Sequence, residues 1–263
     1  MTTHFSDRLV TRLATAGWVT AFTGAGVSAE SGVPTFRGAD GVWAKFKPEE
    51  LANMDAFIRN PKLVWEWYAH RKQVIAQVKP NPGHEALVRL EEIVPNFALI
   101  TQNIDNLHRR AGSRTIHELH GNIERNYCME CGTLYNNAEV LGKSGVPLCD
   151  RCGGKIRPDV VWFGEMLPED AWNAAVRAAS SADVFLSIGT SAVVYPAASL
   201  PLLARRSGGV LVEINPEPTP LTEQTDEFLQ GPSGAILPAL VAAVEEAQAI
   251  GAHPSHTPNS HLR

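Results

Sequence analysis

Continuous apolar runs divide the chain into predicted strands and helices. Four runs have the length of a strand: residues 18–23, 97–101, 184–188 and 210–214. Runs that are apolar throughout are typical of parallel strands covered on both faces. Between them, apolar residues recur at helical spacing and predict helices over residues 5–16, 84–93, 168–179, 196–205 and 235–249. This alternation predicts an α/β fold with a doubly wound parallel sheet.

Two segments do not continue this alternation. Residues 36–79 are rich in aromatic residues and helix formers, and residues 122–158 hold every cysteine among turn-forming residues. We interpret them as two insertions that pack together into a smaller lobe. The large domain is then expected to be discontinuous and to comprise residues 1–35, 80–121 and 159–250.

Composition limits the classes of function. The 263 residues include 23 basic and 28 acidic side chains, which gives a formal net charge of −5. This charge disfavours nucleic acid or an anionic membrane as a general partner. The chain has neither 18 consecutive apolar residues nor a signal-peptide pattern, so we expect a cytoplasmic protein. The polar residues 251–263 are expected to form a disordered tail, and their three histidines leave a metal-binding tail as the alternative.

The four cysteines have the spacing of a zinc site. Cys128, Cys131, Cys149 and Cys152 form the pattern C-x2-C-x17-C-x2-C. In such sites each C-x2-C pair supplies two thiolates to one tetrahedron. Two disulfides or redox-active pairs are the alternatives, and neither is typical of an intracellular chain with two clustered pairs. The spacing predicts one zinc ion, and four protein ligands leave no open position, so the zinc is expected to be structural.

A glycine-rich loop follows the first predicted strand. Residues 24–29 (GAGVSA) fit the pattern G-x-G-x-x-A, in which glycines let the backbone approach a pyrophosphate at a helix N-terminus. In an ordinary dehydrogenase a long helix and a second strand follow, with an acidic residue about 20 positions on. Here Gly32 and Pro34 interrupt the helix. The loop therefore predicts a dinucleotide site that differs from that of a hydride-transfer enzyme.

Several longer segments match one known family in the same order. They are GAGVSAESGVPTFRG at 24–38, TQNIDNLHRRAG at 101–112, HELHGN at 117–122, the double C-x2-C, PDVVWFGEMLP at 158–168, GTSAVVYPAASLP at 189–201 and EINPEPT at 213–219. Together they resemble the sirtuins, NAD-dependent protein lysine deacylases. The resemblance implies a Rossmann-like large domain and a small lobe made of a zinc module and a helical insertion. It also implies that NAD lies in the cleft between them and that an acyl-lysine peptide enters from the other side.

The resemblance implies roles for particular residues. His120 is implied as the catalytic base, which suits a side chain whose pKa lies near neutrality, and Asn103 as the residue that positions ribose or water. The implied cofactor-binding residues are Gly24, Ala25, Gly26, Phe36, Arg37, Gln102, Asn103, Ile104, Asp105, Gly189, Thr190, Ser191, Asn215 and Ser233. The implied strip that pairs with the substrate backbone is Val161, Trp162, Phe163 and Gly164.

Each of these roles has a plainer structural alternative. His120 could be a structural histidine beside the cysteines, and Phe36 could belong to the core. Residues 102–105 could form an Asx turn that caps the next helix. Residues 189–191 and Asn215 could be simple turns at strand ends.

A pair of residues on one predicted helix concerns the acyl group. Tyr68 and Arg71 are spaced i and i+3 and therefore share a helix face. This Y-x-x-R resembles the desuccinylase- and demalonylase-type (class III) sirtuins, in which the pair binds the distal carboxylate of succinyl- or malonyl-lysine. The planar guanidinium fork suits a carboxylate. The alternative is an exposed ion pair between Arg71 and Glu66 or another acid.

The predicted function is NAD-dependent removal of succinyl, malonyl and also acetyl groups from protein lysines, with release of nicotinamide and O-acyl-ADP-ribose. Mono-ADP-ribosyl transfer at the same NAD site is the alternative, and Asn103, His120 and the Y-x-x-R pair favour deacylation. A zinc-ribbon nucleic-acid binder is disfavoured by the mixed charges between Cys128 and Cys152. The expected partners are acylated-lysine proteins or peptides, without nucleic acid or membrane, and the chain is expected to be a monomer.

Overall fold

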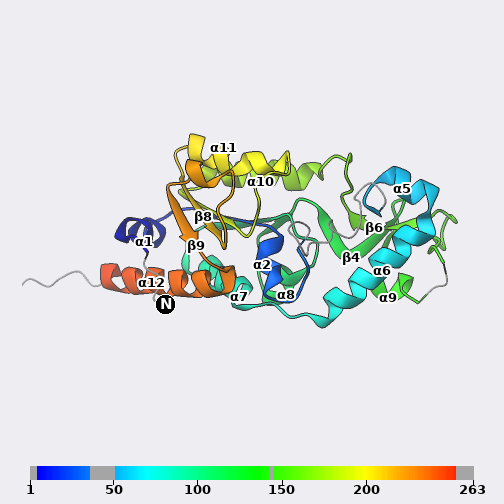
Figure 1. The fold of residues 1–263 in the computed structure, drawn as a ribbon, viewed down its shortest axis with the longest axis horizontal. Helices are drawn as coiled ribbons and strands as arrows, with labels where there is room; N and C mark the ends of the chain where they lie inside the picture. Colours follow the sequence, from blue (N-terminus) through cyan, green and yellow to red (C-terminus); the bar gives the residue numbers. More distant parts are fainter. Residues whose placement is uncertain (1–4, 36–50, 143–144, 253–263) are drawn as a thin grey trace, which may run out of the picture.

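The computed structural model describes residues 5–35, 51–142 and 145–252. Phe36 and Arg37, which are expected to bind the cofactor, lie outside the described residues. Of the tail that is expected to be disordered, only residues 251 and 252 are described. Figure 1 shows an elongated molecule with a large sheet and its helices at one end and a smaller group of strands and helices at the other.

The large lobe is built on a six-stranded parallel sheet in the order β3-β2-β1-β7-β8-β9. Its strands are β1 (Val19–Thr23), β2 (Phe97–Thr101), β3 (Ile116–Glu118), β7 (Val184–Ile188), β8 (Val210–Asn215) and β9 (Glu227–Gln230). Every residue of β1, β2 and β7 is buried, as their apolar sequences predict. The chain builds outward from β1 on one side and from β7 on the other, so the order reverses between these two strands. The predicted doubly wound α/β fold is confirmed.

Helices cover both faces of this sheet, as Figure 1 shows. The helices are α1 (Asp7–Ala14), α7 (Pro82–Ile93) and α12 (Ser233–Ala252) on one face, and α10 (Glu169–Ser181) and α11 (Leu200–Arg206) on the other. Within the described ranges, α12 alone has the length and mean hydropathy of a membrane-spanning helix. Its buried residues Ile236, Leu240 and Val244 belong to the same apolar cluster as residues of α1 and α7, so its apolar face packs on the sheet.

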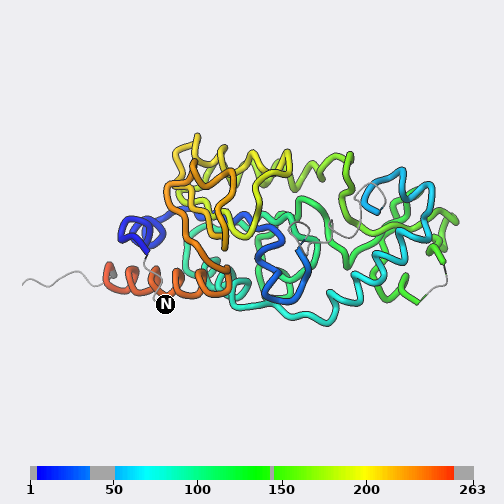
Figure 2. The backbone as a smooth tube through the Cα atoms, in the orientation of Figure 1, coloured from blue at the N-terminus to red at the C-terminus, as the bar shows by residue number. Residues whose placement is uncertain are grey.

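The small lobe combines the two insertions. Its three-stranded antiparallel sheet has the order β5-β4-β6, and Figure 2 shows the 51–77 and 121–160 segments at the same end of the molecule. The elements are α5 (Met54–Arg59), α6 (Pro61–Gln77), β4 (Gly121–Cys128), β5 (Leu134–Asn136), α9 (Asn137–Val140) and β6 (Ile156–Val160). One apolar cluster joins α5 and α6 to this sheet, and the Trp65 indole N–H donates to the Ile156 carbonyl at 2.7 Å. The predicted smaller lobe is confirmed, with its sheet extending slightly beyond residues 122–158.

A buried lysine fastens α6 to the cysteine-containing segment. Lys72 is 2% exposed, and its ammonium donates to the Ile123 carbonyl and to the side-chain oxygens of Asn126 (2.9 Å) and Asn137 (2.8 Å). Burial lowers the pKa of Lys72 to about 7, against the opposing charges of Glu124 and Asp159. The side chain therefore links three parts of the small lobe through one charged group.

Candidate functional site

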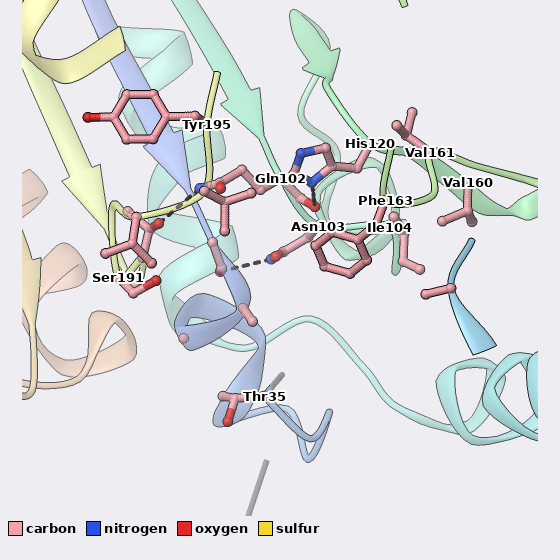
Figure 3. Close-up of a pocket in the computed structure, with 18 of the residues that line it drawn as sticks. Thr35, Gln102, Asn103, Ile104, His120, Val160, Val161, Phe163, Ser191 and Tyr195 are labelled. Atoms are coloured by element: carbon pink, nitrogen blue, oxygen red, sulfur yellow. Dashed lines mark hydrogen bonds between the residues drawn. The ribbon is translucent and has the colours of Figure 1, made fainter. Parts of the chain in front are cut away.

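The carboxyl ends of β1, β2, β7 and β8 border a cavity of about 640 Å³. This is the edge at which open α/β sheets bind ligands, beside the point where the strand order reverses. The predicted residues that line the cavity on this side are Gly24, Ala25, Gly26, Gln102, Asn103, Ile104, His120, Gly189, Thr190, Ser191 and Asn215. The predicted residues on the small-lobe side are Tyr68, Val161, Trp162, Phe163 and Gly164. Figure 3 shows that the labelled residues of both sides surround one space.

The glycine-rich loop packs directly on the loop that follows β7. The short helix α2 (Ala25–Ala29) begins at Gly24, and the Gly26 N–H donates to the Gly189 carbonyl at 2.8 Å. A Cβ atom on Gly26 would lie 2.8 Å from the Gly189 Cα, so only glycine permits this approach. The helix ends at Ala29, ahead of Gly32 with its φ of +87°. The early end of this helix agrees with the sequence prediction.

Gln102 and Asn103 connect the loops after β1, β2 and β7. The Asn103 amide donates to the Gly24 carbonyl at 3.0 Å and to the Ser28 hydroxyl at 3.2 Å. Both amide hydrogens are thus engaged, and the amide oxygen can act only as an acceptor. The Gln102 amide donates to the Thr190 hydroxyl at 2.9 Å. Asn103 therefore presents an oxygen that could bind a hydroxyl group or a water molecule.

His120 is held in one orientation and one tautomer. Its Nδ1 lies 2.9 Å from the Gln102 carbonyl oxygen, an atom that can only accept, so Nδ1 carries the hydrogen (Figure 3). In the neutral ring, Nε2 then keeps the lone pair and can take up a proton. Burial lowers the pKa of His120 below its ordinary value, against the opposing effect of the Gln102 carbonyl. The imidazole is therefore uncharged at neutral pH, as a general base must be.

A buried carboxylate organises the end of β8. The side chain of Asn215 donates to the Thr190 carbonyl at 2.9 Å and to Glu213 at 3.0 Å. Glu213 is fully buried and also accepts from the hydroxyls of Thr219 and Thr222. These bonds tie the cavity-lining 216–220 segment to the sheet. Sequence reasoning did not select Glu213, although an acid inside an apolar strand was the available signal.

Among the described residues, three of those predicted to bind cofactor or substrate lie outside the cavity lining. Asp105 is buried and accepts the Leu107 N–H at 2.9 Å, which forms an Asx turn directly before α8 (Leu107–Ala111). Its burial raises the pKa of the carboxyl group. Ser233 donates to Glu30 at 3.2 Å, at the start of α12. Arg71 lies behind the lining, so direct contact of these three residues with a ligand stays a prediction.

Tyr68 and Arg71 are both buried on α6. Tyr68 lines the cavity and is 2% exposed, and Arg71 is 9% exposed with its guanidinium 5.0 Å from the centre of the Trp67 ring. Glu66 forms an exposed ion pair with Lys62 at 3.7 Å, on the same helix. Burial lowers the pKa of Arg71, and the charges of Tyr68 and Asp105 oppose that shift. Arg71 is therefore not the exposed partner of Glu66, and an ion pair of Arg71 with another acid stays the alternative.

The four cysteines converge at the far end of the small lobe. Their sulfur atoms all lie within 4.8 Å of one another, with 3.4 Å between Cys128 and Cys152 and 3.6 Å between Cys131 and Cys149. Four sulfurs about 2.3 Å from one zinc ion would be about 3.8 Å apart, and a disulfide would need about 2.0 Å. The hydroxyl of Tyr135 lies 3.1 Å from the Cys149 sulfur and also within hydrogen-bond distance of the Asp150 carboxylate, so its one hydrogen has two acceptors beside the cysteine cluster. The residues fit one tetrahedral zinc, and the disulfide alternative is wrong.

Two buried histidines below the glycine-rich loop predict an acid-sensitive fold. The rings of His84 and His108 are 4.8 Å apart, and burial lowers the pKa of His84 to about 4 and that of His108 well below its ordinary value. In the unfolded chain a histidine titrates near pH 6.5. Between that pH and about 4, His84 binds a proton in the unfolded chain but not in the native protein. The free energy of unfolding is therefore highest above this pH range and falls as the pH decreases through it.

We expect the protonation of His84 in the unfolded chain to lower the free energy of unfolding by about 3 kcal/mol between pH 7.5 and pH 4. Urea unfolding at several pH values measures this loss. His84→Gln should show a smaller loss over the same window, because one of the two histidines that titrate there is absent. Equal losses in the two proteins would assign the acid sensitivity to other groups.

Comparisons with known proteins converge on one family. The profile of the Sir2 family matches residues 24–196. A protein named NAD-dependent protein deacylase 2, from Pyrobaculum aerophilum, is 53% identical over 236 residues, which cover 89% of this chain and 93% of that protein. NAD-dependent protein deacylase 1 from Archaeoglobus fulgidus is 47% identical over 241 residues, or 92% of this chain and 98% of that protein.

Solved structures give the same result. A Sir2 homologue in complex with NAD has a TM-score of 0.88 and 46% identity, covering 94% of this chain and 96% of that one. A Sir2 complex with a p53 peptide and NAD+ has a TM-score of 0.80 and 36% identity, covering 95% of this chain and 99% of that one.

Proposed function

This chain belongs to the Sir2 family, as its sequence motifs predict, and on that basis we propose that it removes acyl groups from protein lysines with consumption of NAD. The observation that carries the proposal is His120, a half-buried imidazole whose lowered pKa favours the neutral form and whose Nε2 has no hydrogen-bond partner among the described residues, in a cavity between the glycine-rich loop and the 161–164 strip. The curated relatives named as NAD-dependent protein deacylases support the same activity.

The residues around the cavity divide the chemical tasks. When bound, NAD supplies the sugar carbon that accepts the acyl oxygen and releases nicotinamide as the leaving group. His120 takes up at Nε2 the proton that a ribose hydroxyl loses, and the Gln102 carbonyl keeps the ring in place. The Asn103 amide oxygen orients a hydroxyl or water beside it. Gly24, Ala25 and Gly26 leave room for the phosphates at the end of β1.

We further propose that the preferred acyl groups end in a carboxylate, as in succinyl- and malonyl-lysine. Tyr68 lies in the cavity wall and Arg71 is buried one helical turn later, behind it. A carboxylate that leaves water must meet a fixed cation to offset the cost of desolvation. The guanidinium of Arg71 supplies that charge in the part of the small lobe that faces the cavity.

Arg71→Met should lower kcat/KM on succinyl- and malonyl-lysine peptides by about 2–4 kcal/mol, the scale for breaking a desolvated ion pair. The fall on the acetyl version of the same peptide should be far smaller, since acetyl carries no charge. Lys62→Met is the matched control, because Lys62 is an exposed cation on the same helix. An equal fall on both acyl groups would mean that Arg71 stabilises the fold or balances the charge of the nearby Asp105. It would contradict the proposed preference for acyl groups that end in a carboxylate.

Mono-ADP-ribosyl transfer at the same NAD site is the second candidate function. Incubating the protein with NAD and a panel of acetyl-, malonyl- and succinyl-lysine peptides distinguishes the two reactions by mass. Deacylation yields O-acyl-ADP-ribose and free lysine, whereas transferase activity adds ADP-ribose to a protein side chain. Detection of the modified protein without the acyl product would overturn the deacylase proposal.

A further inference from the structure

The hydroxyl group of Tyr68 has a defined hydrogen-bonding state. The indole Nε1 of Trp162 lies 2.9 Å from this hydroxyl oxygen, and an indole N–H can only donate. The phenol oxygen is therefore the acceptor in this bond, and its own hydrogen must point elsewhere. The charged groups that act on the phenol are Arg71 and Arg157, which offer only donors, and Glu165, whose carboxylate accepts from Arg157 and from the Trp162 backbone N–H. Among the described residues the phenol hydrogen meets no hydrogen-bond acceptor, so it is available to one that enters the cavity.

Trp162 is itself held by a buried ion pair. The guanidinium of Arg157 stacks 3.5 Å from the centre of the Trp162 ring and is 2% exposed. Arg157 makes two hydrogen bonds to Glu165, at 2.5 Å and 2.9 Å, and Glu165 also accepts the backbone N–H of Trp162 at 2.7 Å. The ring of Phe57 packs on the indole at 5.3 Å between centroids. The direction of the indole N–H is therefore fixed before any substrate arrives.

We propose that Trp162 is a specificity-determining positioning residue, whose indole N–H fixes the Tyr68 hydroxyl as a donor toward the terminal carboxylate of the acyl group. This role is additional to the place of Trp162 in the strip along the substrate backbone, and it rests on the proposed carboxylate preference. A donor that is already oriented loses less rotational freedom on binding, which favours affinity. An acetyl group has no terminal oxygen at this depth and gains nothing from the arrangement.

The test is a double-mutant cycle in which each protein is compared by its ratio of catalytic efficiencies on two peptides. Trp162→Phe removes the N–H and keeps an aromatic ring for Phe57 and Arg157 to contact, and Tyr68→Phe removes the hydroxyl. The measured quantity is kcat/KM on a succinyl-lysine peptide divided by kcat/KM on its acetyl counterpart. Each single variant should lower this ratio by about tenfold, the scale for a hydrogen bond to a charged group. In the Tyr68→Phe background, Trp162→Phe should change the ratio by less than about twofold, because the hydroxyl it orients is gone.

Trp65→Phe is the matched control. It removes another indole N–H that donates within the same lobe, to the Ile156 carbonyl, from a residue outside the cavity lining. Its ratio should equal that of the unaltered protein. The proposal is overturned if Trp162→Phe leaves the ratio unchanged, or lowers it equally with and without the Tyr68 hydroxyl.

Failure of the underlying function gives a different result. If the unaltered protein shows no preference for succinyl peptides and Arg71→Met leaves the ratio unchanged, the carboxylate preference falls and the inference falls with it. If Arg71→Met lowers the ratio and Trp162→Phe does not, only the role of Trp162 is wrong.

Discussion

Replacing His120 by alanine should lower turnover of acyl-lysine peptides by at least about a hundredfold, the usual lower range for loss of a general base. NAD binding should stay largely intact, because the side chains of Gln102 and Asn103 are held by Thr190, Gly24 and Ser28, in bonds that do not involve the imidazole. Within the part of the chain that the structure describes, the hydrogen bond of the His120 side chain is to a backbone carbonyl, and its loss leaves the side-chain bonds of the neighbouring loops in place.

Turnover of one peptide and NAD affinity by calorimetry measure the two effects separately. His117→Ala is the matched control, since His117 lies on β3 three residues earlier and outside the cavity lining. The control should retain turnover within a few-fold of the unaltered protein. Near-normal deacylation by folded His120→Ala would exclude this imidazole from proton transfer.

The second large effect concerns the cysteine cluster. Cys128→Ser or Cys149→Ser should release the metal and yield a poorly folded or aggregated protein, because binding of a structural zinc contributes about 10 kcal/mol or more to the folding of a small module. The segment between Cys128 and Cys152 contains short strands and turns with few buried apolar residues of its own. Its chain direction reverses after each C-x2-C pair at Gly132 and Gly153, whose φ angles are +70° and +75°.

Metal content by mass spectrometry and thermal unfolding test this expectation. Chelation of the unaltered protein should give the same loss of stability as the serine variants, and added zinc should restore it only where all four cysteines are present. A variant that lost zinc but kept its melting temperature and activity would show that the metal is dispensable.

The central strands could be predicted well from the sequence, because strands that are buried on both faces have continuous apolar sequences. The expected strands at 97–101 and 184–188 coincide with β2 and β7. The short strands β3 and β9 were missed because most of their residues are only half-buried and form no continuous apolar run. β4 was also missed, since its polar residues conceal it. Asn126, which is fully buried there, is satisfied by a lysine 54 positions away, a pairing that no local pattern contains.

The candidate site was predictable where it is made of loops at strand ends. The motif residues after β1, β2 and β7 do share one cavity, because parallel strands bring their carboxyl ends to one edge. Side-chain networks were not predictable in the same way. The contact between Tyr68 and Trp162 joins positions 94 residues apart, and the Asx-turn carboxylate of Asp105 could not be distinguished from a ligand-binding carboxylate by sequence alone.

The three hydrogen bonds of Lys72 have a mechanical consequence. Lys72 follows Arg71 on α6, and its ammonium is fastened to β4 and to the start of α9. The helix cannot tilt without pulling oxygens of both elements with it or breaking buried bonds. A movement of α6 that widens the cavity should therefore carry β4 and the start of α9 with it, so the wall that holds Tyr68 and the strand that leads into Cys128 would move together.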